Sequence, residues 1–461
     1  MVFSSLNFLF IFFPVTLAVY LLVPFRAKNI VLLIASIIFY AWGEPVYVIL
    51  MLLSILLNYI VGLQFEAASS SSARKKHLAA GIAVNLMLLG FFKYSGLIVT
   101  TFNSIFGTSL LFREPGLPIG ISFYTFQALS YVIDAYRGKV KIQHNIIDFA
   151  TYITMFPQLI AGPIVTYSQI ETQLKSRRVS LAQSGAGIER LILGLSKKVI
   201  LANNLGALYA QIQSMTDRSV MLAWLGAIAY TLQIYFDFSG YSDMAIGMGK
   251  MLGFNFPENF DFPYLADSIT VFWRKWHMTL SGWFRDYVYI PLGGNRVSVF
   301  RHIFNIMIVW MLTGLWHGAG WNFVLWGIYY GILLIIEKYI LIPLCSRLPG
   351  IVKHIYTLFL VNLGWVLFSN TDFNQMTAYL GDMFGAGTGV FADSAFLYLL
   401  KSNIILLILS VTACSPVLRR LLARISRKSS AAAAAICILL FLISVSFLVY
   451  GSYNPFLYFR F

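Results

Sequence analysis

Charged residues are scarce in this sequence: only 11% of the 461 residues are Asp, Glu, Lys or Arg, whereas 59% are hydrophobic. The hydrophobic residues come in solid runs of roughly 17 to 25 residues, and each run could cross about 30 Å of hydrocarbon as a helix. This pattern excludes an ordinary soluble protein. The unbroken runs also differ from the alternating strands of a membrane β-barrel. We therefore expect an all-α polytopic membrane protein.

Cysteine is also scarce. The three cysteines, Cys345, Cys414 and Cys437, form no C-x-x-C pair and lie in or beside apolar runs. The spacing predicts neither a disulfide framework nor a metal site. We interpret the cysteines as packing residues and expect no metal and no permanently bound cofactor.

Acidic residues are few, and the formal net charge is +15. The basic residues form short clusters between apolar runs, which is typical of cytoplasmic loops that face anionic lipid, so we expect membrane lipid and no nucleic acid as a partner. Residues 1–7 carry no side-chain charge, while Arg26 and Lys28 follow the first run. The positive-inside rule therefore predicts an N-terminus outside the cytoplasm. The first run, Phe3 to Pro24, lacks a basic start and a cleavage site, so we expect no removable signal peptide.

The runs predict roughly eleven transmembrane helices in a single membrane domain, residues 1–461, without an internal repeat. Proline and glycine interrupt residues 156–163, and broken backbone at membrane depth survives only against protein or a wet cavity. We expect a re-entrant element or a cavity wall there. Ile188 to Leu201 is expected to form an amphipathic helix at the membrane interface.

Two histidines stand in tryptophan-rich apolar settings, His277 after residues 272–276 (FWRKW) and His317 within residues 314–322 (GLWHGAGWN). An imidazole can be neutral within a bilayer and still exchange a proton near pH 7. Glycines beside His317 allow a ligand or another backbone to approach closely. We therefore predict that His317 is a general base, and that His277 is a second base, an orienting group or a structural residue. The alternative for His317 is a histidine bonded to a neighbouring helix.

Basic and aromatic residues near the two histidines suit an anionic ligand from the cytosol, because arginine matches phosphate oxygens. The binding residues that we predict are Trp273, Arg274, Trp276, Arg285, Asp286, Asn295, Arg296, Trp316, Trp321 and Asn322. An ordinary positive-inside loop with one Arg–Asp pair explains the same basic segment and stays open as an alternative.

Two carboxylates, Asp237 and Asp243, interrupt an apolar run together with Ser239 and Tyr241. Carboxylates are costly in lipid, so we expect these four residues to face inward and line a tunnel or support the structure. The six-residue spacing puts the two carboxylates on different helix faces. We therefore predict arginine partners for them and no paired acid/base site.

Three segments, residues 272–280, 283–296 and 313–327, resemble the signature of the membrane-bound O-acyltransferases. The similarity extends to residues 117–138 and 225–263 and is greatest to the bacterial branch typified by the alginate O-acetyltransferase membrane subunit. The sequence departs from this branch at Ser369, where arginine is common.

The resemblance implies a ring of helices and re-entrant pieces around a central funnel, with the catalytic core at about residues 117–340. It identifies His317 with the family's near-universal histidine and His277 with its second one. The implied reaction moves an acyl group, usually acetyl from acetyl-CoA, to an extracytoplasmic hydroxyl on a polysaccharide or a partner protein. An esterase-like (SGNH-type) partner and the bacterial plasma membrane are also implied.

Two alternatives remain open at this point. D-alanyl transfer to teichoic acid from a carrier-protein thioester would need a docking surface for the carrier. A transporter or polysaccharide export channel would also suit polar, broken helices and intramembrane histidines.

Overall fold

The computed structural model describes residues 1–160, 162–341, 348–451 and 457, and every structural statement below refers to these residues. They form helices and no strand, as the sequence predicts. Cys345 and most of the tail after residue 451 lie outside the described residues.

The chain divides into two compact units. Unit 1 consists of residues 1–191 and 241–257, and unit 2 of residues 192–240 and 258–461. Helices α9 and α11 each contribute residues to both units. The single membrane domain and the core at residues 117–340 stay predictions.

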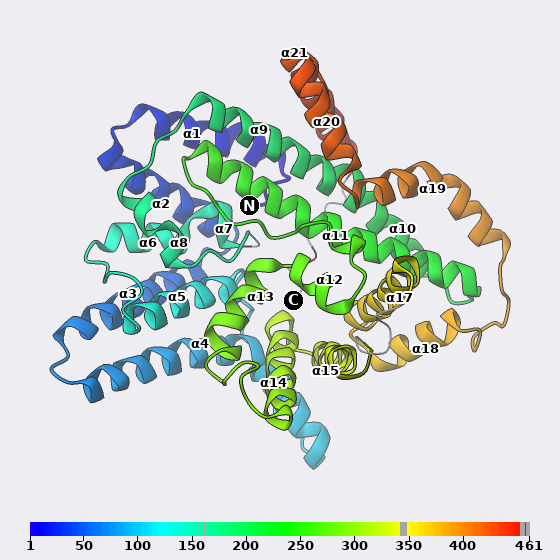
Figure 1. Cartoon of the computed structure of the whole chain (residues 1–461), viewed down its shortest axis with the longest axis horizontal. Helices are drawn as coiled ribbons and strands as arrows, with labels where there is room; N and C mark the ends of the chain where they lie inside the picture. Colours follow the sequence, from blue (N-terminus) through cyan, green and yellow to red (C-terminus); the bar gives the residue numbers. More distant parts are fainter. Residues whose placement is uncertain (161, 342–347, 452–456, 458–461) are drawn as a thin grey trace. The chain divides into compact units, whose positions relative to one another are not determined.

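Unit 1 is built mainly from the first nine helices of the described chain (Figure 1). They are η1 (Phe8–Phe12), α1 (Phe13–Leu22), α2 (Phe25–Ala41), α3 (Tyr47–Ala67), α4 (Ser71–Phe106), α5 (Ile121–Tyr136), α6 (Ile146–Thr154), α7 (Phe156–Leu159) and α8 (Tyr167–Lys175), followed by the start of α9 (Leu181–Ser196). Helix α5 is buried along almost its whole length although it carries several polar side chains. The interrupted segment is enclosed by protein at α7, where the Phe156 N–H donates to Ser36 Oγ at 3.0 Å.

Unit 2 holds the end of α9 and most of the later helices. They are η2 (Lys197–Ala202), α10 (Asn203–Gln213), α11 (Val220–Met251), η3 (Pro263–Leu265), α12 (Ile269–Lys275), α13 (Met278–Phe284), η4 (Arg285–Tyr289), α14 (Val299–His317), α15 (Trp321–Ile336), η5 (Glu337–Leu341), α17 (Gly350–Ser369), α18 (Phe373–Met383), α19 (Ser394–Ala413), α20 (Val417–Lys428) and α21 (Ser430–Tyr450).

Nine helical runs in the described ranges are long and apolar enough to cross a membrane. They are residues 47–67, 71–106, 181–213, 220–251, 299–317, 321–341, 350–369, 394–413 and 430–450, and a shorter apolar run covers residues 8–22. The chain is therefore a multi-pass membrane protein. The count of roughly eleven that the sequence suggests exceeds these nine runs, because it also included shorter helices.

The interfacial helix expected at residues 188–201 stays a prediction. This segment belongs to a continuous helical run, residues 181–213, that is long enough to span a membrane. The cations that suggested a polar face do not all face water: the Lys198 side chain is only 2% exposed, and its Nζ lies 2.6 Å from Asp237 Oδ1. At Lys198, a buried ion pair therefore replaces the predicted polar surface.

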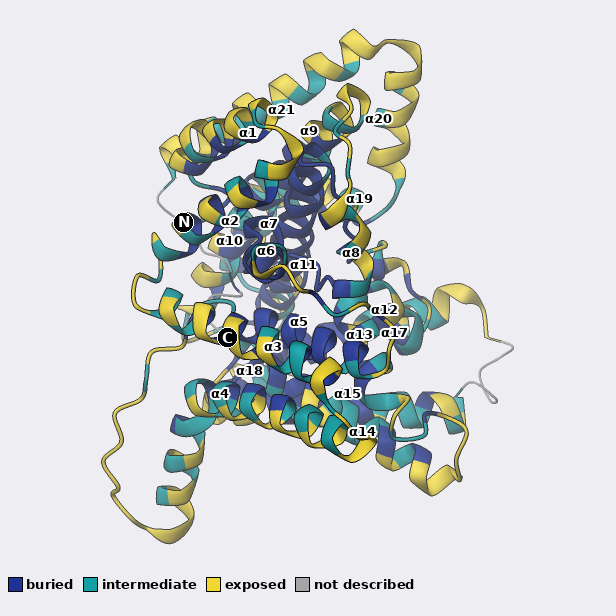
Figure 2. Cartoon of the chain, turned by 90° about the vertical axis from the view of Figure 1, so that its left-hand side faces the viewer, coloured by how far each residue is buried: buried dark blue, intermediate teal, exposed yellow. Residues whose placement is uncertain are grey.

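Helix α11 is buried over most of its length, which Figure 2 shows in dark blue. Its two carboxylates have separate partners. In unit 1, Asp243 pairs with Arg190 at 2.6 Å, which confirms the predicted arginine. In unit 2, Asp237 pairs with Lys198, so an arginine partner was the wrong prediction there, because the adjacent helix η2 presents a lysine.

Candidate active site

Helices α14 and α15 form a hairpin in which their backbones approach closely, and His317 lies at the end of α14. Helix α14 ends at His317, and α15 begins at Trp321. A methyl group on Gly327 would lie 2.4 Å from the Trp310 carbonyl oxygen, so only glycine permits this approach. His317 thus lies at the turn of this hairpin.

His317 is 4% exposed and is enclosed by aromatic rings of unit 2. Its ring centroid lies 5.1 Å from Trp316, 5.1 Å from Trp326 and 5.4 Å from Phe368, and all three contacts are edge-to-face. Asn322, four residues before Trp326 on α15, is also buried, and its Nδ2 donates to the Phe368 carbonyl at 3.3 Å. Trp316 and Asn322 therefore belong to the environment of His317, as predicted.

His277 lies in the joint between α12 and α13. Its backbone is in the left-handed region, with φ of 43°, which is uncommon for a non-glycine residue and is often associated with functional sites. Two backbone hydrogen bonds hold this joint: the Met278 N–H donates to Asn259 O at 2.9 Å, and the Asp261 N–H donates to Lys275 O at 3.0 Å. The segment at residues 259–261 thus fixes the direction of the His277 side chain.

Asn259 also determines the tautomer of His277. Its Oδ1 accepts from the Thr279 backbone N–H at 3.3 Å and from Thr279 Oγ1 at 2.9 Å, and it lies 3.1 Å from His277 Nδ1. Because an amide oxygen only accepts, Nδ1 of His277 carries the proton and donates. Nε2 therefore presents a lone pair, and this buried atom has no hydrogen-bond partner within the described residues.

His277 is electrically neutral near pH 7. Burial lowers its pKa well below the usual value, and the neighbouring His317 lowers it further. The two imidazole centroids are 6.4 Å apart, and Trp316 contacts both rings. The two imidazoles thus share one apolar enclosure. The buried Nε2 lone pair of His277 could accept a hydrogen bond from a ligand that donates a proton.

Helix α12, which leads to His277, is anchored at its N-terminus by a carboxylate. Glu337, only 2% exposed, accepts from the backbone N–H groups of Ile269 at 2.7 Å and Thr270 at 2.9 Å. Ser268 caps the same end by accepting from Val271 N–H at 3.1 Å. A negative charge at a helix N-terminus is favourable. Glu337 therefore holds the α12–α13 joint in unit 2.

The aromatic wall around the histidines is larger than predicted. Trp273 and Trp276 belong to it, since Trp273 lies 5.4 Å from Trp326 and Trp276 lies 4.7 Å from Trp365, measured between ring centroids. Trp326, Trp365, Phe368, Phe238 and Asn259 were not predicted as site residues. Trp365 and Phe368 lie beyond residue 340, the end of the predicted core. One signal was available for Trp326, because it shares a helix face with Asn322.

Four predicted binding residues and one predicted wall residue are exposed. The wall residue is Trp321, which is 51% exposed. Arg285 pairs with Asp286 at 2.7 Å. Arg274, Arg285, Asn295 and Arg296 are exposed. The predicted phosphate-binding role of this segment and the alternative of an ordinary loop with one local Arg–Asp pair both stay predictions.

The four predicted tunnel residues are all buried on α11, and their role in a tunnel stays a prediction. Asp237 and Ser239 are buried in unit 2, whereas Tyr241 and Asp243 belong to unit 1. Tyr241 stacks on Phe3 with centroids 4.3 Å apart. Tyr241 thus has a packing role, and the two carboxylates hold ion pairs. Within the described ranges, no group of three or more His, Cys, Asp or Glu side chains is arranged to hold a metal ion.

Several known proteins are similar to this chain. The profile of the membrane-bound O-acyltransferase family matches residues 139–369, which include both histidines. A protein of Pseudomonas aeruginosa named "Probable alginate O-acetylase" is 44% identical over 84% of this chain and 76% of its own length. A peptidoglycan O-acetyltransferase of Helicobacter pylori is 34% identical over 84% of this chain and 80% of its own. A teichoic acid D-alanyltransferase of Bacillus subtilis is 27% identical over 56% of this chain and 70% of its own.

Proposed function

The chain belongs to the membrane-bound O-acyltransferase family and is an O-acyltransferase, and from this premise we propose that it transfers acetyl from cytosolic acetyl-CoA to a hydroxyl outside the cytoplasm. The observation that carries the proposal is the pair of buried imidazoles, 6.4 Å apart, inside one aromatic enclosure.

His317 acts as the general base. It accepts the proton of the acceptor hydroxyl while the hydroxyl oxygen bonds to the thioester carbonyl carbon. When the carbon–sulfur bond breaks, the imidazolium of His317 returns the proton to the departing thiolate. Such proton transfer typically contributes about 10² to 10⁴ in rate.

His277 orients the reacting groups. Its Nε2 lone pair is buried and fixed in direction by Asn259, so it accepts a hydrogen bond from a donor group of the bound substrate. The tryptophans around both rings exclude water, which suppresses hydrolysis of the thioester. Trp316, which touches both imidazoles, separates the two histidines from their surroundings.

The acceptor that we propose is a hydroxyl of a cell-envelope polysaccharide, reached directly or through an esterase-like (SGNH-type) partner. The names of the O-acetylating relatives from Pseudomonas aeruginosa and Helicobacter pylori support this class of acceptor. The proposed location is the bacterial plasma membrane, with the N-terminus outside, in line with the positive-inside pattern.

The test measures radiolabelled acetyl transfer from acetyl-CoA to a glycan acceptor by the purified protein in lipid nanodiscs. We expect His317→Ala to lower the rate by about 10² or more, and His277→Ala to lower it less. His144→Ala is the matched control, because this histidine is exposed and pairs only with Glu66 on the surface. Equal rates for the wild-type protein and His317→Ala would remove His317 from the mechanism.

Two other outcomes separate the alternatives. Activity with an acyl carrier-protein thioester and none with acetyl-CoA would favour D-alanyl-type transfer, the reaction named for the more distant Bacillus subtilis relative. Glycan movement across the membrane without acetylation would favour the transporter alternative.

A further inference from the structure

Helix α20 is a short, strongly basic helix between two membrane spans. It follows α19 after three residues and precedes α21 after one. Both neighbours are long and apolar enough to cross a membrane. With such short connections, both ends of α20 must stay close to the same face of the membrane.

The sequence of α20 separates apolar from basic residues. Val417, Leu418, Leu421, Leu422 and Ile425 follow the i, i+1, i+4, i+5, i+8 spacing of a single helix face. The four arginines occupy the other side of the helix, and Lys428 is its last residue. The arginines are Arg419, Arg420, Arg424 and Arg427, and the helix holds no acidic residue.

No residue of α20 is buried by protein, and Figure 2 shows the helix in yellow along nearly its whole length. Val417 is 54% and Leu421 51% exposed, although both belong to the apolar face. Within the described part of the chain, the basic side chains of α20 have no ion-pair partner. The protein thus leaves both faces of this helix uncovered.

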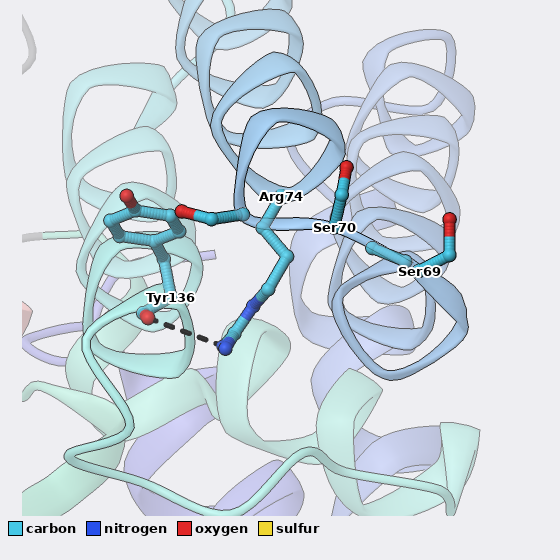
Figure 3. Close-up of a pocket in the computed structure, with 6 residues that line it drawn as sticks. Ser69, Ser70, Arg74 and Tyr136 are labelled. Carbon is cyan, nitrogen blue, oxygen red and sulfur yellow. Dashed lines mark hydrogen bonds between the residues drawn. The ribbon is translucent and has the colours of Figure 1, made fainter.

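A second basic cluster shows the contrast. Arg74 lines an open pocket of about 390 Å³ at the start of α4 (Figure 3). Its Nη2 donates to the Tyr136 carbonyl at 3.3 Å, and its guanidinium lies 5.9 Å from the Tyr136 ring centroid. The Arg74 guanidinium therefore already has protein contacts, unlike the arginines of α20.

We propose that α20 lies in the cytoplasmic membrane interface and binds anionic phospholipid headgroups. Its apolar face enters the acyl boundary, and its arginines bind the lipid phosphates, as in other amphipathic helices with basic polar faces. Lipid is the ligand that we propose for the apolar face of α20, because the short connections to the membrane spans α19 and α21 hold this helix at the bilayer surface. This inference concerns a surface outside the candidate active site and does not depend on the acetyl donor or acceptor.

The experiment measures lipid selectivity of the purified full chain. The protein is incubated with equal amounts of phosphatidylglycerol and phosphatidylcholine and is then washed. The lipids that it retains are quantified by mass spectrometry. The variant Arg420→Gln with Arg424→Gln and Arg427→Gln should lower the retained phosphatidylglycerol-to-phosphatidylcholine ratio by about fivefold or more, because each cation near an anionic surface contributes to binding. Raising the salt concentration should lower the wild-type ratio in the same direction.

Two control variants keep the result interpretable. Changing the exposed Lys75, Lys76 and Lys141 to Gln removes the same charge elsewhere and should leave the ratio unchanged. Replacing Arg420, Arg424 and Arg427 by Lys keeps the charge and should preserve the ratio even if the Gln variant is unstable. The proposal would be overturned if wild type and a folded Gln variant gave equal ratios, or if the Lys variant lost selectivity. An equal fall in the variant of Lys75, Lys76 and Lys141 would also overturn it.

Discussion

Asn259 is the residue on which the orientation of His277 depends. A buried amide oxygen that already accepts two Thr279 hydrogens leaves His277 Nδ1 only the donor role. Asn259 acts on the proposed reaction through His277 and not through a contact with substrate, so it is a positioning residue.

We expect Asn259→Ala to lower kcat by about tenfold or more with a smaller change in KM, because the tautomer and ring direction of His277 are then no longer fixed. Steady-state acetyl transfer measures both constants. Asn259→Asp keeps an acceptor for Nδ1 and should retain more activity. Its negative charge favours the imidazolium, so the acidic limb of the pH–rate profile should move to higher pH. An unshifted profile in Asn259→Asp would contradict the contact with His277.

The lowered pKa of His277 also predicts a pH dependence of stability. The folded protein holds this imidazole neutral, whereas the unfolded chain protonates it below its ordinary pKa of about 6.5. The stability that depends on a neutral His277 is therefore fully present above about pH 6.5. It is lost as the pH falls below this value, because the unfolded chain takes up the proton more readily than the folded protein. The thermal midpoint of the wild-type protein should fall between pH 7.5 and 5.5. In His277→Gln this fall should be smaller, and an identical fall in both proteins would exclude His277 as its source.

At this scale, part of the site could be predicted. The apolar, tryptophan-rich settings identified His277 and His317, and the structure places both in one enclosure. Asn259 could not be predicted, since it acts across an 18-residue separation and lies in no helix. The 51% exposure of Trp321 could not be predicted, because the sequence does not show on which side of the hairpin its ring emerges.

Among the elements, η2 and α11 are joined within unit 2 by a buried ion pair. Lys198 and Asp237 are each 2% exposed at the side chain, and the Leu457 backbone N–H also donates to Asp237 Oδ2 at 2.9 Å. Removal of one partner leaves an uncompensated charge in an apolar interior. The pair thus connects η2, α11 and a tail residue within unit 2.

We expect Lys198→Ala or Asp237→Ala to destabilise the protein by about 3 to 5 kcal/mol, as for other broken buried pairs. Thermal unfolding in detergent or nanodiscs, followed by loss of monodisperse protein, measures the effect. The double variant Lys198→Met with Asp237→Leu removes both charges and should be closer to wild type than either single variant. Additive losses in the double variant would show that the two charges do not compensate each other.

The capping of α12 by Glu337 is another element-level feature that the sequence did not predict. Glu337 stands 68 positions after Ile269, and nothing local connects an acidic residue of a membrane span with the start of a short helix. Conversely, the existence of the long apolar helices followed from local composition alone, because a run of apolar residues must satisfy its backbone internally in lipid.

For the whole molecule, the distribution of basic clusters predicts a fixed orientation in the membrane. Residues 69–76 and α20 should face the cytoplasm, and residues 107–118 the outside. Single cysteines introduced at Ser71, Thr108 and Ser426 on a cysteine-free background should show this in intact cells. A membrane-impermeant thiol reagent should label position 108 and leave positions 71 and 426 unlabelled until the cells are opened. The reverse labelling would invert the proposed topology.

The sequence by itself determined the class of this protein, since hydrophobic length and the positions of basic clusters act locally and decide which segments enter a bilayer. Its two histidines could be selected in the same way. Only the tertiary structure decided which side chains surround them and which partner each buried charge has. Those contacts join residues tens to hundreds of positions apart, such as Asn322 with Phe368 and Asp237 with Leu457. They depend on the close packing of whole helices, which no local pattern specifies.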